Sequence, residues 1–179
     1  MTPGSEPMIL TVGHSTRSIE DFVALLRDHG VTTLADIRTI PRSRRNPQYE
    51  SSALANALET AGIRYVHLPG LGGLRRPRRD SPNGAWRNES FRGYADYMQT
   101  DTFARALEDV LELARRGRLA LMCAEAVPWR CHRSLVADAL AVRGVPVAHI
   151  VGAGLARPHQ LSLAARVQDH RLTYPPAGK

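Results

Sequence analysis

The chain has 179 residues, of which 43% are hydrophobic and 23% are charged, as is typical of one ordinary globular domain. No apolar run approaches the roughly 18 residues that a membrane span requires, and the polar start of the chain does not resemble a secretory signal. We therefore expect a cytoplasmic protein that is not inserted in a membrane. The formal charge of +7 indicates anionic partners such as phosphates, nucleotides or nucleic acid.

Short apolar runs typical of strands alternate with amphipathic segments typical of helices. We expect five strands, at residues 8–12, 31–37, 63–68, 119–122 and 146–151. We expect helices at residues 19–29, 51–61, 91–98, 102–116 and 132–143, and a last one at 161–170. The stretch 69–89 is rich in glycine, proline and arginine, and a loop of this length is usually functional or mobile.

Strands joined by crossover helices predict an α/β fold with a mainly parallel five-stranded sheet and helices on both faces, a Rossmann-like arrangement. We expect a single domain over residues 8–174, between a flexible N-terminus at 1–7 and a flexible tail at 175–179. Right-handed crossovers place every loop from a strand to its helix at one edge of the sheet, and open α/β sheets bind ligands at that carboxyl edge.

Polar residues directly follow three of the expected strands: His14 and Ser15, Asp36 and Arg38, and Cys123 and Glu125. Since these strands are expected to be parallel, their polar residues should meet at the carboxyl edge. The sequence therefore predicts a functional site there.

The densest group of reactive side chains runs from Cys123 to Arg133, in the order CAEAVPWRCHR. A helix N-terminus has unpaired N–H groups and a partial positive charge, so it binds anions and lowers the pKa of a nearby thiol. Cys131 lies at such a position, between Arg130 and His132, and we expect it to be the more reactive cysteine, with a lowered pKa, provided that it is accessible to solvent. The layout resembles the Cys-loop-Arg cradle of phosphatases and rhodaneses, although six residues separate Cys123 from Arg130 where those families have five.

Other interpretations of these residues stay open. Cys123, Cys131 and His132, with His14 from the first loop, could form a Cys/His set for zinc or iron. However, seven residues between the cysteines is not a common zinc spacing. The two cysteines could also be a redox pair, without the C-x-x-C spacing. Each polar residue also has a purely structural interpretation, as a capping residue, a buried hydrogen-bonding group or half of an ion pair.

Two arginine-rich stretches, at 38–45 and 75–79, have an aromatic residue nearby, Tyr49 and Trp86 respectively. Arginines beside aromatic side chains suit phosphate contacts and base stacking, so a nucleic-acid-binding module without catalysis is a further hypothesis. Gly72 and Gly73 are candidates for substrate binding, although glycine there also suits a simple turn.

Four sequence motifs occur in one order along the chain: TVGHS at 11–15, DIR at 36–38 leading to Pro41 and Ser43, LGG at 71–73, and MCAE at 122–125 continuing to CHR at 131–133. With these motifs the chain resembles the domain-of-unknown-function family 488, from residue 8 to about residue 151. The resemblance implies an α/β fold and a shared polar site, and it implies no particular reaction.

We therefore expect an enzyme, or an enzyme-like domain, that acts on an anionic and phosphate-containing substrate. The candidate catalytic residues are Cys123, Glu125, Cys131, His132 and His14. The candidate substrate-binding residues are Ser15, Asp36, Arg38, Arg130, Arg133, Gly72 and Gly73. One cysteine would be the nucleophile, and Glu125, His14 or His132 would carry the proton. The sequence predicts no particular cofactor and no oligomeric state.

Overall fold

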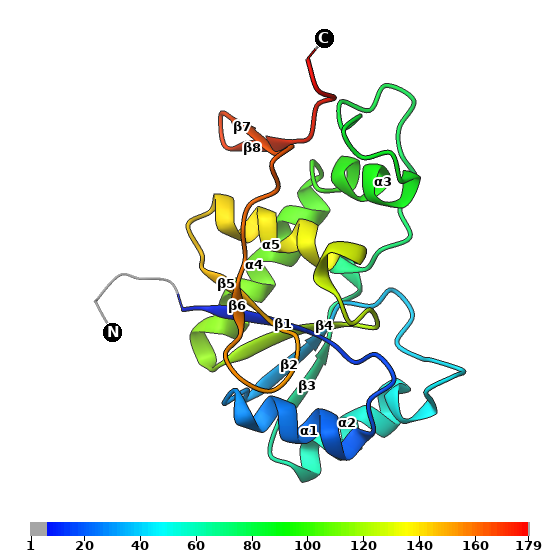
Figure 1. Cartoon of the computed structure of the whole chain (residues 1–179), viewed down its shortest axis with the longest axis vertical. Coiled ribbons are helices and arrows are strands. Elements are labelled where there is room, and N and C mark those ends of the chain that lie inside the picture. The colour runs from blue at the N-terminus through cyan, green and yellow to red at the C-terminus, as the bar shows by residue number, and fades with distance from the viewer. Residues whose placement is uncertain (1–6, 179) are drawn as a thin grey trace.

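A six-stranded sheet lies at the centre of the computed structural model, which describes residues 7–178 (Figure 1). The strands are β1 (Ile9–Gly13), β2 (Thr33–Asp36), β3 (Arg64–His67), β4 (Leu119–Cys123), β5 (Val147–Ile150) and β6 (Arg157–Pro158), in the spatial order β3-β2-β4-β1-β5-β6. The first five run parallel, which confirms the predicted class of fold. The short antiparallel edge strand β6 was not predicted.

Helices cover both faces of this sheet. The α-helices within residues 7–178 are α1 (Ile19–Asp28), α2 (Ser51–Thr60), α3 (Glu89–Tyr97), α4 (Asp101–Arg116) and α5 (Arg133–Val142). Figure 1 shows α1 and α2 on one side of the sheet, and α4 and α5 on the other. None of the helices described has both the length and the apolar character needed to cross a membrane.

Side chains that alternate along the strands fill two separate cores. Ile9 packs with α4 and α5, whereas its neighbour Leu10 packs with α1 and α2, as expected when successive strand residues point to opposite faces. Local signals also set the helix ends: the Ser18 hydroxyl accepts a hydrogen bond from the Asp21 N–H and caps α1. The sheet is thus covered by helices on both faces.

The prediction of a last helix at 161–170 is wrong. This part of the chain contains a hairpin of β7 (Arg166–Gln168) and β8 (Arg171–Thr173), which pair antiparallel. Asp169 and His170 form its two-residue turn with φ of 51° and 64°, the left-handed backbone that tight hairpin turns require. Leu163 is 96% exposed and Leu161 is also exposed, whereas Ala165 packs in the core, so the apolar residues of this segment do not share one buried helical face.

The termini can be judged only in part. Residues 1–6 of the predicted flexible N-terminus lie outside the described residues, as does Lys179 of the predicted tail. Residues 175–178 have no regular secondary structure. Their flexibility, like the proposed domain limits, stays a prediction.

The connections between strands place a crevice around the end of β4. The chain leaves β1 and β2 for α1 and α2 on one face, whereas it leaves β4 for α5 on the opposite face. In open α/β sheets, neighbouring strands whose helices lie on opposite faces leave a crevice between their carboxyl ends. Since β4 pairs with both β1 and β2, the loop after Cys123 lies between two such switch points.

Candidate functional site

On the β1 side, the crevice is closed by backbone contacts. His14 N–H donates to the Cys123 carbonyl (3.0 Å) and Ser15 N–H donates to the Ala124 carbonyl (2.9 Å). A Cβ atom at Gly13 would lie 1.8 Å from the Glu125 carbonyl oxygen, so only glycine allows the exits of β1 and β4 to approach this closely. The open side of the crevice therefore lies between β2 and β4.

A cavity of about 380 Å³ occupies this open side, and we call it the carboxyl-edge pocket. It is lined by seven of the predicted site residues, namely Arg38, Gly73, Cys123, Glu125, Arg130, Cys131 and His132. The remaining lining residues are Arg42, Thr39, Ile40, Leu74, Ser90, Phe91 and Ala124. The sequence analysis missed the apolar wall of Ile40, Leu74 and Phe91, because these residues become neighbours only through the fold.

The two thiols contact one another at the wall of this pocket. Cys131 S–H donates to the Cys123 sulfur at 2.7 Å, and the Arg133 guanidinium Nη1 donates to the same sulfur at 3.4 Å. Burial raises the pKa of Cys123, but the hydrogen bond from Cys131, the Arg133 charge and the Glu125 backbone together leave that pKa below its ordinary value. Cys123 is therefore the thiol that the structure prepares to ionise.

The expectation that Cys131 has the lowered pKa is wrong. Its hydrogen bond to Cys123, its burial and the charge of Cys123 all raise the Cys131 pKa. Helix α5 begins at Arg133, and the Arg133 N–H does reach the Cys131 sulfur at 3.5 Å. The hydrogen bond from the Arg133 N–H lowers the Cys131 pKa, but the hydrogen bond to Cys123 raises that pKa more. A thiol that donates its proton to a neighbouring thiolate holds that proton more tightly.

Arg133 is completely buried, and its guanidinium lies behind the thiols. Besides Cys123, Nη1 donates to the Glu125 carbonyl (3.1 Å) and Nη2 donates to the Ala126 carbonyl (3.2 Å). Its Nε atom is buried and finds no hydrogen-bond partner among the described residues. Arg133 therefore holds the loop after β4 and supports the Cys123 thiolate, and we revise its predicted role from substrate contact to this support.

His132 presents one free ring nitrogen to the thiol pair. Its Nε2 lies 3.1 Å from the Ile37 carbonyl, which assigns the ring proton to Nε2 and leaves Nδ1 unprotonated, 3.5 Å from the Cys131 sulfur. Burial is the largest cause that lowers the pKa of His132 to about 4, and the Arg133 charge lowers it further. The ring is therefore a neutral hydrogen-bond acceptor near neutral pH.

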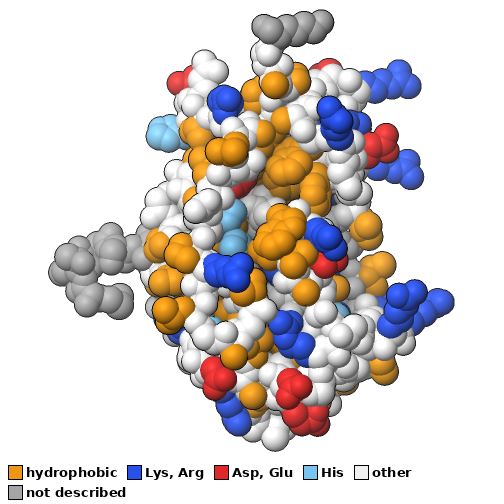
Figure 2. Space-filling view, in the orientation of Figure 1, with side chains coloured by type: hydrophobic (Ala, Val, Ile, Leu, Met, Phe, Trp, Pro, Cys, Tyr) orange, Lys and Arg blue, Asp and Glu red, His pale blue; other side chains and the backbone are white. Residues whose placement is uncertain are grey.

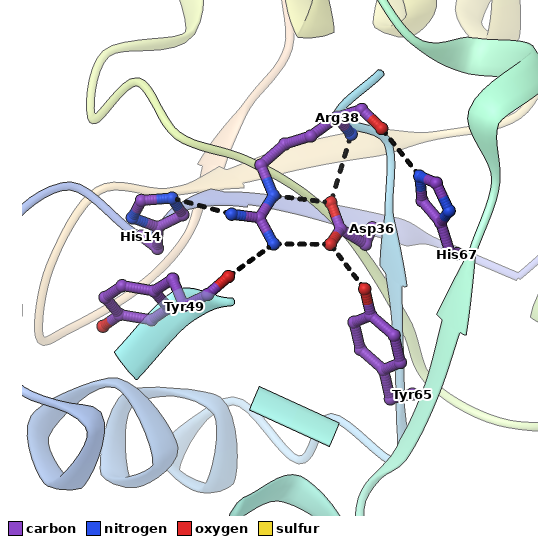
Figure 3. Close-up of polar contacts among 6 residues, drawn as sticks. All are labelled: His14, Asp36, Arg38, Tyr49, Tyr65 and His67. Carbon is purple, nitrogen blue, oxygen red and sulfur yellow. Dashed lines mark hydrogen bonds and ion pairs between the residues drawn. The ribbon is translucent and has the colours of Figure 1, made fainter. Parts of the chain in front are cut away.

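Asp36 and Arg38 form a buried ion pair at the end of β2 (Figure 3). Arg38 Nε and Nη2 donate to the two carboxylate oxygens of Asp36 at 2.9 and 2.7 Å, and Nη2 also donates to the Tyr49 carbonyl (2.8 Å). The Tyr65 hydroxyl donates to Asp36 at 2.7 Å. The Asp36 carboxylate therefore binds Arg38 and Tyr65 and does not line the pocket, whereas Arg38 contributes to the pocket wall.

His14 completes this network from β1. Its ring stacks on Tyr49 with the centroids 4.0 Å apart, its Nδ1 donates to the Ser15 carbonyl (2.8 Å), and its Nε2 lies 3.4 Å from Arg38 Nη1. Burial lowers the pKa of His14 to about 4. His14 thus lies at the same sheet edge as Cys123, as predicted, but neither it nor Ser15 lines the pocket.

The two aromatic residues expected to stack bases make ring contacts within the protein, Tyr49 as a buried residue and Trp86 as a half-buried one. Tyr49 is completely buried, and Trp86 makes edge contacts with Phe91 and Tyr174. The arginine-rich loop beside Trp86 is held in place, since the Asp96 carboxylate accepts hydrogen bonds from the Arg78 N–H, Ser81 and Asn83. This arrangement does not favour a surface for stacking single-stranded nucleic acid.

Gly72 and Gly73 allow close packing of their loop. A Cβ at Gly72 would lie 2.4 Å from the Thr39 hydroxyl, and a Cβ at Gly73 would lie 3.2 Å from His132 Nδ1. Thr39 also donates to the Gly73 carbonyl at 2.9 Å. These contacts explain both glycines without a bound ligand, although Gly73 does line the pocket.

The alternative hypothesis of a metal site has no support from the geometry. No group of three or more His, Cys, Asp or Glu residues in the described part of the chain is placed to hold a metal ion. The four proposed ligands do not converge, since the His14 ring contacts Ser15 and Tyr49, while His132 bonds the Ile37 carbonyl.

A second polar network lies between β1, α5 and β5, and the sequence analysis missed it. It runs from the Thr11 hydroxyl through His149 and His159 to the Asp138 carboxylate, which also accepts a hydrogen bond from the Tyr174 hydroxyl (2.8 Å). The available signal was Asp138, a carboxylate within the otherwise apolar stretch 135–142. All four imidazole nitrogens have partners, so the network leaves no free proton acceptor.

A second cavity, of about 600 Å³, lies beside this network and is lined by His149, His159, Trp86 and Trp129 among others. Figure 2 shows hydrophobic and histidine side chains side by side around a hollow in the middle of the face drawn. Neither of the two candidate nucleophiles, Cys123 and Cys131, lines this cavity.

Comparison with known proteins identifies a family. A search found no similar protein among the curated proteins, and none among the solved structures. The family model described as Domain of unknown function DUF488 matches residues 18–140, which include α1 to α4, most of α5 and the whole loop from Cys123 to Arg133. The chain therefore belongs to the DUF488 family.

Proposed function

We propose that this protein is a thiol-dependent enzyme that acts on an anionic, phosphate-containing substrate in the carboxyl-edge pocket, with Cys123 as the nucleophile. The observation that carries the proposal is the pair of donors on the Cys123 sulfur, from Cys131 at 2.7 Å and from Arg133 at 3.4 Å. A thiolate is the reactive form of cysteine, and neighbouring donors and positive charge favour it.

Positive charge around the pocket supports an anionic substrate. Arg42 and Arg130 line the pocket and are exposed, so their guanidinium groups can contact a ligand directly. Buried Arg133 has its own hydrogen bonds to make, and it contributes through its charge. Guanidinium groups bind phosphate oxygens strongly because they offer several N–H donors in one plane.

The rest of the pocket supports the remaining roles. Glu125 is exposed and lines the pocket, so it is the proposed proton carrier for the leaving group. Ile40, Leu74 and Phe91 offer an apolar wall, which suits a phosphate compound that also has an apolar part. We place the enzyme in the cytoplasm, where reducing conditions preserve thiols.

The proposed first step is attack by the Cys123 thiolate on the electrophilic centre of the substrate, which forms a covalent intermediate. Before the attack, the hydrogen bonds from Cys131 and Arg133 stabilise the Cys123 thiolate. After the attack, they orient the sulfur of the covalent intermediate. As the new bond to sulfur forms, the bond between the electrophilic centre and the leaving group breaks, and Glu125 gives its proton to the leaving group.

The test uses two small alkylating agents, because they probe the nucleophile and the charge preference before a substrate is known. Iodoacetate is anionic and iodoacetamide is neutral, and both alkylate thiolates. Their rates are measured by peptide mass spectrometry and divided by their rates with glutathione. We expect Cys123 to be alkylated before Cys131 and to favour iodoacetate relative to glutathione, and inorganic phosphate should slow the reaction.

Arg130→Ala is the variant that tests the anion site, and Arg105→Ala on the exposed face of α4 is its control. Loss of one partly exposed charge contact of about 0.5–1 kcal/mol corresponds to a two- to fivefold loss of the iodoacetate preference. Arg105→Ala should leave the preference unchanged. Alkylation of Cys131 before Cys123 would overturn the choice of nucleophile, and equal loss in both variants would overturn the anion site.

A further inference from the structure

We propose that Cys123 and Cys131 form a reversible disulfide, so that the thiol pair is a modification site for a small hydroperoxide. The two sulfur atoms lie 2.7 Å apart, whereas bonded sulfur atoms lie about 2.05 Å apart. These are the chain's two cysteines, and both are unpaired. Seven residues separate the two cysteines, which is not the C-x-x-C spacing of a redox motif. The two sulfur atoms nevertheless meet, because the loop after β4 and the short helix Pro128–Arg130 fold back.

The surroundings give the two thiols different roles. The Cys123 sulfur accepts hydrogen bonds from Cys131 and Arg133, which favours its thiolate and makes it the first atom to be oxidised. Cys131 donates its S–H to that same sulfur and is therefore already next to the atom it would attack. Cys123 is thus the oxidised thiol, and Cys131 is the thiol that resolves it.

The reaction balances with one hydroperoxide. The Cys123 thiolate attacks one peroxide oxygen, the O–O bond breaks, and the product is a sulfenic acid with hydroxide as the leaving group, which a proton converts to water. The Cys131 sulfur then attacks the Cys123 sulfur, and the S–O bond breaks. The departing hydroxide takes the Cys131 proton and leaves as water. Two thiols and hydrogen peroxide thus give one disulfide and two molecules of water.

Burial selects the size of the oxidant. Cys123 and Cys131 are only 2% and 7% exposed, and both face the carboxyl-edge pocket. A molecule the size of hydrogen peroxide fits this cavity, whereas a folded protein cannot bring a disulfide of its own to either sulfur. The nearby Cys131 also protects Cys123, because disulfide formation competes with irreversible oxidation to sulfinic acid.

The inference deepens the proposed function, since it rests on the same Cys123 thiolate. A disulfide would remove the nucleophile and make the enzyme inactive until a dithiol reduces it. The test, however, needs no substrate. If the disulfide forms but Cys123 shows no selective alkylation in the reduced protein, the proposed function fails alone. If selective alkylation occurs but no disulfide forms, only this inference fails.

The experiment treats the full-length reduced protein with one equivalent of hydrogen peroxide, then denatures it in N-ethylmaleimide and measures its intact mass. We expect both thiols to disappear together with a loss of two hydrogen atoms, about 2 Da, and dithiothreitol to restore them. Cys131→Ser should accumulate a Cys123 sulfenic acid that dimedone traps. In Cys123→Ser, no loss of two hydrogen atoms within one chain should occur, because Cys131 then lacks the sulfur with which it pairs.

Three results would overturn the proposal. The first is wild-type protein that gains oxygen atoms and never loses the two hydrogens. The second is a disulfide between two chains, seen as a dimer on a non-reducing gel. The third is Cys131→Ser protein in which hydrogen peroxide produces no Cys123 sulfenic acid that dimedone traps. The first two need only the wild-type protein, so they remain decisive if a variant fails to fold.

Discussion

Replacing Arg133 by methionine should both destabilise the protein and raise the pKa of Cys123. The side chain is completely buried, and its loss leaves the carbonyl groups of Glu125 and Ala126 without their donor. Hydrogen bonds to a charged group contribute about 1.5–3 kcal/mol each. Part of this loss is offset, because the buried Arg133 Nε is unpaired and its removal gains about 1–3 kcal/mol. We therefore expect the free energy of unfolding to fall by roughly 2–4 kcal/mol.

Urea unfolding and thiol alkylation measure the two effects separately. Arg143→Met is the matched control, because Arg143 lies at the end of the same helix and its ion pair with Glu108 (2.7 Å) is partly exposed. Exposed ion pairs contribute about 0–1 kcal/mol, so the control should remain close to the wild type in stability. The rate of iodoacetamide alkylation at Cys123 across pH gives the thiol pKa, which should rise only in Arg133→Met.

Different outcomes would refute different parts of this reasoning. If Arg133→Met is as stable as Arg143→Met, Arg133 does not hold the loop after β4. If Arg133→Met is less stable but the Cys123 alkylation profile is unchanged, the loop support stands and the thiolate support is refuted.

Two further predictions concern stability. The pKa values of His14, His132 and His149 are lowered from 6.5 to about 4, 4 and 3, chiefly by burial, so below about pH 6.5 the unfolded chain binds protons that the folded chain does not. The free energy of unfolding should therefore fall as the pH is lowered from about 6.5 to 4, by up to about 1.4 kcal/mol per pH unit for each histidine. A free energy of unfolding, measured with urea, that stays constant from about pH 7 to 5 would contradict this. Asp138→Asn should lower the free energy of unfolding by about 1.5–3 kcal/mol, because it removes the charge that accepts the network's hydrogen bonds. Asp109→Asn, on the exposed face of α4, should change the unfolding midpoint little, and equal effects of the two variants would argue against a stabilising network.

Much of the fold could be predicted because its signals are local. The apolar runs of the five parallel strands, the Ser18 cap and the periodicity of α4 each depend on residues close in sequence. The handedness of crossovers places the carboxyl ends of the parallel strands at one edge, so the meeting of the polar residues after β1, β2 and β4 at that edge could be predicted as well. The local signals failed at β6 and at the β7–β8 hairpin, which are short and carry few buried apolar residues.

The roles within the site could not be predicted in the same way. His14 and Asp36 follow their strands as expected, yet hydrogen bonds and stacking inside the protein hold them away from the pocket. Arg130 and Arg133 are three residues apart, and one is exposed whereas the other is completely buried. Burial of this kind depends on what packs from other parts of the chain.

The choice between the two thiols shows most clearly where local reasoning ends. The amino-acid sequence alone determines that both cysteines lie near the end of one parallel strand and the start of one helix, because hydrophobic periodicity and crossover geometry are properties of the sequence pattern. Only the tertiary structure determines which thiol ionises. It places Cys131 as a donor to Cys123 and puts the Arg133 guanidinium behind that sulfur, and the direction of a hydrogen bond and the position of a buried charge decide which sulfur holds its proton less tightly.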